Sequence, residues 1–319
     1  MILAYYLLFE KTNKEGEDIM EFVFIIGVSR TGSKIYMNVL NQNSDINLLT
    51  ELNFFAPRWV RKDFRYYVKK YLGDINSKTD VLKLIDLMYS GIINGTFWTI
   101  ESWDISGVQN SIIGINKEKL TKEILNSNMT YKEIFSILIK EHTIARNKKR
   151  GGAKFPVDIS YLSTLMEWFP DSQFVHIIRD PRAIYSSMIL KDLKNAPNLS
   201  KSKKNIIRIT RLFYLWLQYK QAIKMHKKYK DMNNYYLSRF EDIVLQPETY
   251  LKQLCDFLKI DYKKEMLLPS VVDSSYKESQ KKMGFDKITL SRWKNYISPK
   301  NEAIIKLLLK KEMKVMGYL

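Results

Sequence analysis

The chain has 319 residues, and its 52 Lys and Arg against 34 Asp and Glu give a formal net charge of +18. Because 45% of the residues are hydrophobic and 27% are charged, the chain can bury a large core, which excludes an intrinsically disordered protein. One cysteine and three histidines exclude a disulfide framework and a cysteine-based metal cage, so we expect no metal site.

The excess of basic residues is open to two interpretations. It suits an anionic partner such as nucleic acid, a membrane surface or a polyphosphorylated small molecule. It also follows from AT-rich codons, because Lys, Asn and Ile are abundant throughout the chain. No apolar run approaches the roughly 20 residues that span a bilayer. The opening MILAYYLLF lacks the flanks of a signal peptide, so we expect a cytoplasmic protein.

The first strand is predicted at Phe22–Ile26, where FVFII is a continuous run of β-branched and aromatic residues. Such a run is typical of a strand buried on both faces, as in a parallel sheet. It leads directly into GVSRTGSK and then into the helical pattern IYMNVLNQ. A short second strand is predicted at Ile46–Leu49.

Residues 54–150 are predicted to form a helical insertion that is rich in aromatic side chains. An apolar repeat at helical spacing over 60–71, with Arg and Lys on the other faces, favours an amphipathic helix with a solvated basic side. Thr130 and Glu133 match a capping box, which predicts the start of a further helix.

Strands and helices alternate again in the second half of the chain. Strands are predicted near Lys154, at Phe174–Ile178 and at Tyr235–Ser238. Helices are predicted at about 158–169, from Pro181, at about 203–229 and after Pro247. This alternation predicts an α/β fold with a parallel sheet, helices on both faces and ligands at the carboxyl ends of the strands. We expect one domain over 20–319 that includes the helical insertion.

A candidate phosphate-binding loop follows the first strand. Gly27 and Gly32 have the spacing of the Walker loop, whose backbone N–H groups and following helix N-terminus hold a phosphate. A nucleotide triphosphatase places a lysine before a Ser or Thr that binds magnesium, whereas here Ser33 precedes Lys34. Neighbouring residues of a helix point about 100° apart around its axis. The exchanged order therefore moves both the lysine and the hydroxyl away from the positions that a nucleotide triphosphatase needs. Arg30, within the loop, is then the cation best placed to reach an anion.

At this point the sequence resembles a known family. FIIGVSRTGSKIYMNVLNQNSDI is similar to the 5′-phosphosulfate loop of PAPS-dependent sulfotransferases, in which a strand is followed by GxPRSGTT, where PAPS is 3′-phosphoadenylyl sulfate. This chain departs from that pattern at Ser29, Thr31, Ser33 and Lys34. The hydroxyl exchanges preserve the chemistry, whereas Lys34 changes the expected phosphate contacts. The resemblance implies nucleotide binding by Gly27, Ser29, Arg30, Thr31, Gly32, Ser33 and Lys34.

A second segment, FVHIIRDPRAIYSSMI, resembles the family's 3′-phosphate segment. There an arginine that ends a strand and a serine eight residues later hold the phosphate, and these are Arg179 and Ser187 here. An arginine fork and a hydroxyl about two turns into a helix can converge on one phosphate. Taken alone, an Arg-Asp-Pro turn would instead indicate a helix cap with a local ion pair.

Two further segments resemble the family towards the C-terminus. YYLSRFEDIVLQPETYLKQLCDFLKI is similar to the RYEDL segment, where an aromatic residue lies near the nucleotide, although Phe240 replaces the usual tyrosine. SRWKNYISPKNEAIIKLLLKKEMKVMGYL is similar to the closing segment, where a basic loop approaches the nucleotide, which implies roles for Arg292 and Lys294. The alternative for Arg292 and Lys294 is that they are surface charges without a role in binding. The match is closest to the carbohydrate and tyrosylprotein sulfotransferase branch.

The resemblance also implies catalytic residues. In the tyrosylprotein branch the base is a glutamate about 21 residues after the loop arginine, which corresponds to Glu51. The apolar neighbours of Glu51 would raise its pKa by desolvation, and the alternative is a glutamate in a first helical turn capped by Thr50. Lys154 occupies the position of a lysine beside the transferring group, and the alternative is a solvated loop lysine. His176, inside a predicted strand, is interpreted as a hydrogen-bonded core residue.

The resulting expectation is a cytoplasmic bacterial sulfotransferase. It would move a sulfuryl group from PAPS to a hydroxyl or amine of a small-molecule, carbohydrate, lipid or peptide acceptor without a metal. Arg30 and Lys154 would stabilise charge, Glu51 would act as base, and Arg179 with Ser187 would select the 3′-phosphate. The alternatives are a P-loop kinase or NTPase with magnesium, and a non-catalytic basic protein that binds nucleic acid.

The sequence also carries a hypothesis about where translation starts. Residues 1–19 lack any pattern that the fold requires, and Lys14–Asp18 can be encoded with AGGAG, a ribosome-binding sequence shortly before the Met20 codon. We therefore expect Met20 as the natural start and a translated leader before it. The alternative is a terminal strand or helix that packs on the domain through Tyr5, Tyr6 and Phe9.

Overall fold

The computed structural model describes residues 21–49, 68–69, 72–73, 75, 77–90, 92–93, 96–97, 114–155, 159–269 and 283–319. The proposed start at Met20, the candidate base Glu51 and most of the first half of the expected insertion lie outside these residues. Among the described residues, no helix combines the length and apolar character needed to cross a bilayer.

A parallel five-stranded sheet forms the centre of the molecule, in the order β2-β5-β1-β6-β7. Its strands are β1 Val23–Gly27, β2 Ile46–Leu49, β5 Arg150–Phe155, β6 Gln173–Ile178 and β7 Tyr235–Arg239. All five residues of β1 are buried, as expected for the middle strand of a sheet covered on both faces. The predicted parallel α/β fold is therefore confirmed. A separate antiparallel pair joins β3 Ile92–Ile93 to β4 Thr96–Phe97.

Several helices begin at recognisable sequence signals. Thr130 caps a helix by accepting a hydrogen bond from the Glu133 N–H at 3.3 Å, and Pro181 occupies the first turn of another. The helices are α2 Ser33–Asn41, α4 Lys78–Ser90, α6 Lys117–Asn126, α7 Tyr131–Ile144, α8 Leu162–Trp168, α9 Pro181–Asn195, α10 Lys201–Tyr229, α11 Phe240–Leu245, α12 Pro247–Leu258, α13 Pro299–Leu308 and α14 Lys310–Val315. Short 3-10 turns lie at η2 Ile159–Tyr161, η3 Lys264–Leu267, η5 Lys287–Leu290 and η6 Arg292–Asn295.

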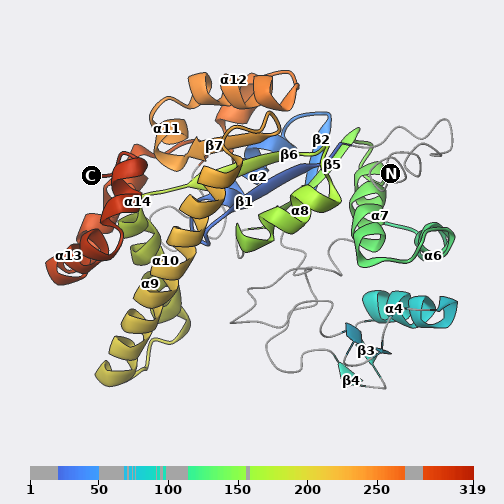
Figure 1. Ribbon diagram of the computed structural model, residues 1–319, viewed down its shortest axis with the longest axis horizontal. Helices are drawn as coiled ribbons and strands as arrows, with labels where there is room; N and C mark the ends of the chain where they lie inside the picture. Colours follow the sequence, from blue (N-terminus) through green and yellow to red (C-terminus); the bar gives the residue numbers. More distant parts are fainter. Residues whose placement is uncertain are drawn as a thin grey trace, which may run out of the picture.

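Helices cover both faces of the sheet (Figure 1). Because side chains alternate along a strand, Phe24 and Ile26 of β1 point to one face and Val23 and Ile25 to the other. The first face is covered by α7, α8, α9 and α10, together with α13 and α14. The second face is covered by α2, α11 and α12.

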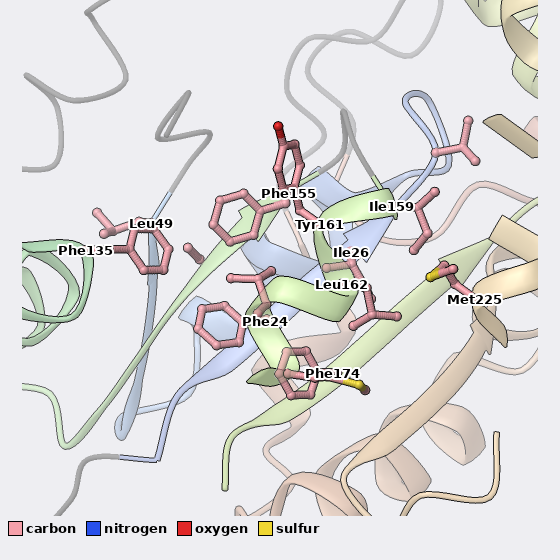
Figure 2. Close-up of a cluster of buried hydrophobic side chains, with 14 of the residues drawn as sticks. Phe24, Ile26, Leu49, Phe135, Phe155, Ile159, Tyr161, Leu162, Phe174 and Met225 are labelled. Carbon is pink, nitrogen blue, oxygen red and sulfur yellow. The ribbon is translucent and has the colours of Figure 1, made fainter. Parts of the chain in front are cut away.

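The core on the first face is strongly aromatic. Figure 2 shows Phe24 of β1 beside Phe155, Phe174 and Phe135. Their ring centroids lie 6.1, 5.4 and 6.3 Å, respectively, from that of Phe24, within the range of favourable aromatic pairs. These contacts join three neighbouring strands to helix α7 and hold the central strand in the core.

His176 lies in β6 on the same face, as the core residue that its sequence context predicts. Its Nδ1 is 2.6 Å from the hydroxyl oxygen of Tyr235, and the side chain has no exposed surface. Burial, followed by the charge of nearby His226, lowers the pKa of His176 to about 3. This histidine is therefore a neutral structural residue at ordinary pH.

Candidate functional site

The candidate site lies where β1 and β6 end side by side. Gly27, the last residue of β1, pairs with Ile177 of β6. The chain after β1 forms a short loop and enters α2 at Ser33, while β6 runs into α9 at Pro181. Two helix N-termini therefore face the same edge of the sheet, which is the usual ligand edge of such folds.

Both glycines of the loop are required by close contacts. A Cβ atom at Gly27 would lie 2.6 Å from the carbonyl oxygen of Ile177. Gly32 has φ +97°, in the left-handed region, and a Cβ there would lie 2.5 Å from the Phe240 ring. The loop therefore passes close to β6 on one side and to α11 on the other.

The loop ends in an open helix N-terminus. Gly32 is the N-cap residue of α2 and, having no side chain, makes no side-chain cap hydrogen bond to the first turn. Within the loop, the Thr31 hydroxyl donates to the Val28 carbonyl oxygen at 2.9 Å, and Arg30 adopts φ +74°. Successive backbone N–H groups at a helix N-terminus attract anions, so this loop fits a phosphate group.

The Arg179 side chain fixes the second segment of the site against the loop. It directly follows β6, is 7% exposed, and donates from Nη1 to the Arg30 carbonyl oxygen and from Nη2 to the Thr289 carbonyl oxygen, both at 3.2 Å. Its guanidinium carbon lies 4.3 Å from the centroid of the Phe240 ring. The aromatic face thus supports a guanidinium whose position is set by two backbone carbonyls.

A direct side-chain contact joins the two predicted phosphate segments. The Arg30 Nε donates to the Ser187 hydroxyl oxygen at 2.9 Å, although the two residues are 157 positions apart. Ser187 is 3% exposed and lies two turns into α9. The structure therefore brings Arg30, Arg179 and Ser187 together, with Arg30 between the other two.

The other predicted site residues differ in their surroundings. Lys154 is 3% exposed and lies inside β5 next to Ile25 of β1, so it is not a solvated loop lysine. Arg292 is buried and bound to Asp286 at 2.9 Å, which places it in a local ion pair rather than on an open surface. Lys294 is exposed. In the loop and the first turn of α2, Ser29 and Lys34 are half-buried and Ser33 is buried.

A buried polar network behind Arg179 is not evident from the sequence. The Asp180 N–H donates to Glu241 Oε1 at 2.9 Å, and the Tyr318 hydroxyl donates to Glu241 Oε2 at 2.7 Å. Burial raises the pKa of Glu241, and these hydrogen bonds oppose that shift. The Asp180 carboxylate caps α9 and binds the Arg182 guanidinium at 2.7 Å. The network holds the turn from which Arg179 extends.

The glutamate of this network had one sequence signal. Glu241 directly follows Phe240 in the segment SRFED, where two acidic residues fill the first turn of α11. That pattern predicts favourable charges at a helix N-terminus, and gives no indication of a partner in the turn after β6. Tyr318 has no such signal, because it lies 77 residues further along the chain.

The arrangement is suited to a ligand with two anionic groups. One group would face the N-terminus of α2, and the other would lie between the Arg179 fork and the Ser187 hydroxyl. The first subsite offers backbone N–H groups, and the second combines a guanidinium with a hydroxyl; groups of both kinds bind phosphates in proteins.

Comparisons with known proteins bear on the identity of the site. The model of the sulfotransferase family matches residues 23–264, which include both segments. Among solved structures, the sulfotransferase domain of the Synechococcus PCC 7002 olefin synthase is 16% identical, with 96% of this chain and 97% of that chain covered and a TM-score of 0.55. The sulfotransferase domain from the curacin biosynthetic pathway is 17% identical, with 92% and 99% covered and a TM-score of 0.51.

A mouse sulfotransferase solved in complex with PAP is 14% identical, with 92% of this chain and 84% of that chain covered and a TM-score of 0.44. A search of curated proteins found no sequence that matches this chain. At these identities, the likeness to the first two solved structures shows a shared α/β fold.

Proposed function

The chain belongs to the sulfotransferase family, and from this premise we propose that it transfers a sulfuryl group from PAPS to a hydroxyl or amine of an organic acceptor. The observation that carries the choice of donor is the meeting of two segments at one edge of the sheet. The Arg179 guanidinium lies 3.2 Å from the Arg30 carbonyl oxygen, and Arg30 Nε lies 2.9 Å from the Ser187 hydroxyl. A donor with phosphates at both the 5′ and 3′ positions needs two such subsites.

The residues present fit this donor. The N-terminus of α2 has no side-chain cap, and Gly32 leaves no room for a side chain between the loop and Phe240. The loop would therefore hold the 5′-phosphosulfate through backbone N–H groups. Arg179 and Ser187 would hold the 3′-phosphate through a charged fork and a hydroxyl.

The remaining roles follow the chemistry of the step. Transfer breaks the bond between sulfur and the 5′-phosphate oxygen, forms a bond between sulfur and the acceptor oxygen or nitrogen, and releases the acceptor proton. We assign stabilisation of the charge on the departing phosphate to half-buried Arg30 and buried Lys154, because cations removed from bulk water act strongly on charge that develops in a dry site. Glu51, outside the described residues, is our candidate to accept the proton.

The order of residues in the first turn of α2 supports this choice over a magnesium-dependent kinase. Ser33 begins the helix and Lys34 follows it, whereas phosphoryl transfer from ATP needs the lysine before the hydroxyl that binds magnesium. We therefore propose that Lys34 does not take the usual part of a Walker lysine.

Thermal unfolding with PAP, ADP and ATP at equal concentrations tests the proposal, where PAP is the 3′,5′-bisphosphate that remains when PAPS loses its sulfuryl group. A ligand that binds only the native state raises the melting temperature according to its affinity, so PAP should give the largest shift. Incubation with PAPS and a panel of phenols, alcohols and amines should then release PAP in an acceptor-dependent manner. A larger shift with ATP and magnesium would instead indicate a kinase. Salt-sensitive binding of oligonucleotides that PAP does not displace would indicate a nucleic-acid-binding protein.

A further inference from the structure

The outer face of α10 is divided into an apolar half and a basic half. We define this face by its exposed side chains at helical spacing, which are Ile206, Ile209 and Phe213 in the first half and Lys220, Lys224, Lys227 and Lys228 in the second. The three apolar residues are 60%, 68% and 58% exposed, respectively. Large apolar side chains with this exposure at consecutive turns of one helix mark an interaction surface.

The opposite face of α10 already has its partners. Leu215 and Tyr219 are fully buried in the core on the first face of the sheet, and Arg211 binds the Asp192 carboxylate of α9 through Nε and Nη2. These contacts fix the rotation of the helix about its axis. The first half of α10 extends with α9 beyond the sheet (Figure 1). The described part of the chain therefore leaves the outer face uncovered.

The charge of α10 has one sign only. Its 29 residues include seven Lys and two Arg, and no Asp or Glu. Lys220 lies with its Nζ 4.9 Å from the centroid of the Trp216 ring, at the boundary between the two halves. The apolar half is thus continuous with an aromatic residue and then with the lysines.

We propose that the outer face of α10 binds the surface of a membrane that contains anionic lipids. Apolar side chains would enter the boundary between headgroups and acyl chains, and the lysines would contact the headgroup phosphates. An amphipathic helix that lies in the membrane plane has this combination of a bulky apolar stripe with basic residues. At 1.5 Å per residue, the helix is about 43 Å long and lies along the surface without crossing it.

Charge complementarity selects this partner over two others. A second copy of the chain that packs α10 on α10 would bring together two helices that carry basic residues and no acidic ones, and such like-charge contact is unfavourable. Nucleic acid would engage the lysines, but it gives no reason for two isoleucines beside Phe213. An anionic bilayer can interact with both halves, since its acyl chains accept the apolar side chains and its headgroups attract the lysines.

Vesicle co-sedimentation of the full chain tests this surface. Vesicles of phosphatidylcholine alone are compared with vesicles that contain about one third phosphatidylglycerol, in low and high salt. One variant combines Ile209→Ser with Phe213→Ser, and the other combines Lys220→Gln with Lys224→Gln. The matched controls are Leu307→Ser, a leucine of α13 that is 76% exposed, and the exposed pair Lys310→Gln with Lys311→Gln in α14.

The full chain should bind the anionic vesicles and bind neutral vesicles weakly. Each α10 variant should lose about tenfold in partitioning, while both controls keep it. Added salt should weaken binding of the full chain and reduce the difference made by the lysine variant. Equal melting temperatures of all the variants exclude unfolding as the cause.

Three kinds of result would overturn the proposal. The first is α10 variants that bind anionic vesicles as the full chain does, or a full chain that binds neither kind of vesicle. The second is a dimer in sedimentation velocity that the serine variant dissociates, which would make the face a subunit interface. The third is oligonucleotide binding that the glutamine variant abolishes while binding to vesicles is unchanged. None of these depends on the donor assignment, because all the readouts are made without nucleotide.

Discussion

Replacement of Arg179 tests how the site recognises a 3′-phosphate. The side chain is 7% exposed and makes two backbone contacts at 3.2 Å and one aromatic contact at 4.3 Å. If it also binds the 3′-phosphate, Arg179→Ala removes a charge-assisted hydrogen bond worth about 1.5–3 kcal/mol. PAP should therefore bind roughly 10- to 150-fold more weakly. ADP lacks the 3′-phosphate, so its affinity should change little.

Isothermal titration calorimetry with both ligands measures this difference. Arg179→Lys keeps the charge without the fork and should recover part of the affinity. Ser187→Ala should weaken PAP binding alone by several-fold, because a neutral hydrogen bond contributes about 0.5–1.5 kcal/mol. Arg211→Ala, which loses the half-exposed ion pair between Arg211 of α10 and Asp192 of α9, should leave both affinities unchanged.

The backbone contacts of Arg179 allow an opposing result. If the side chain serves only to hold the Arg30 carbonyl and the loop after residue 283, its loss would distort the phosphate loop and weaken both ligands alike. Equal losses for PAP and ADP would therefore refute the assignment of Arg179 to the 3′-phosphate.

Three further predictions concern the base, acid stability and the loop. Glu51→Gln should lower kcat about 100-fold with PAP affinity unchanged in a steady-state assay; near-normal turnover on phenols and alcohols alike would show a structural role. Because burial lowers the pKa of His176 to about 3, below its unfolded value near 6.5, only the unfolded chain gains a proton as pH falls from 6.5 towards 3. The protonation of unfolded His176 should therefore lower the free energy of unfolding by about 1.4 kcal/mol for each pH unit in that range. His176→Phe should remove this contribution in urea titrations, and an unchanged dependence of the unfolding free energy on pH would contradict the burial argument. Gly32→Ala should cost about 1–3 kcal/mol in the same titrations and more than Gly73→Ala, which shares a positive φ but meets nothing within 4 Å; equal costs would show that contact with Phe240 is unimportant.

The local parts of the fold could be predicted because their signals lie within short segments. The buried run after Phe22, the glycine loop and the start of α2 form one continuous pattern. The pairing of Arg179 with Ser187 was expected from the family resemblance, and the start of α9 at Pro181 places Ser187 about two turns into that helix. The contact between Arg30 and Ser187 was not predicted, and it follows from the pairing of β1 with β6.

Other parts could not be predicted, because long-range contacts decide them. Gly151 and Gly152 before Lys154 have the composition of a turn, yet they lie inside β5. A Cβ at Gly152 would overlap the Val23 carbonyl of β1, so the glycines permit close strand contact. Lys154 is consequently buried rather than solvated. Glu241 likewise meets Asp180 across 61 residues, which no local pattern encodes.

The order of strands in the sheet has a consequence for how the chain reaches its native state. β1 pairs with β5 and β6, so its VFIIG segment cannot form these strand pairings until residues more than 120 positions later are in place. Closing a loop of that length costs entropy before any pairing compensates for it. During synthesis, this apolar segment emerges well before its partners and presents unpaired edges that favour aggregation. We therefore expect slow folding, and a yield of native protein that depends on temperature and on chaperones that shield β1 until β5 arrives.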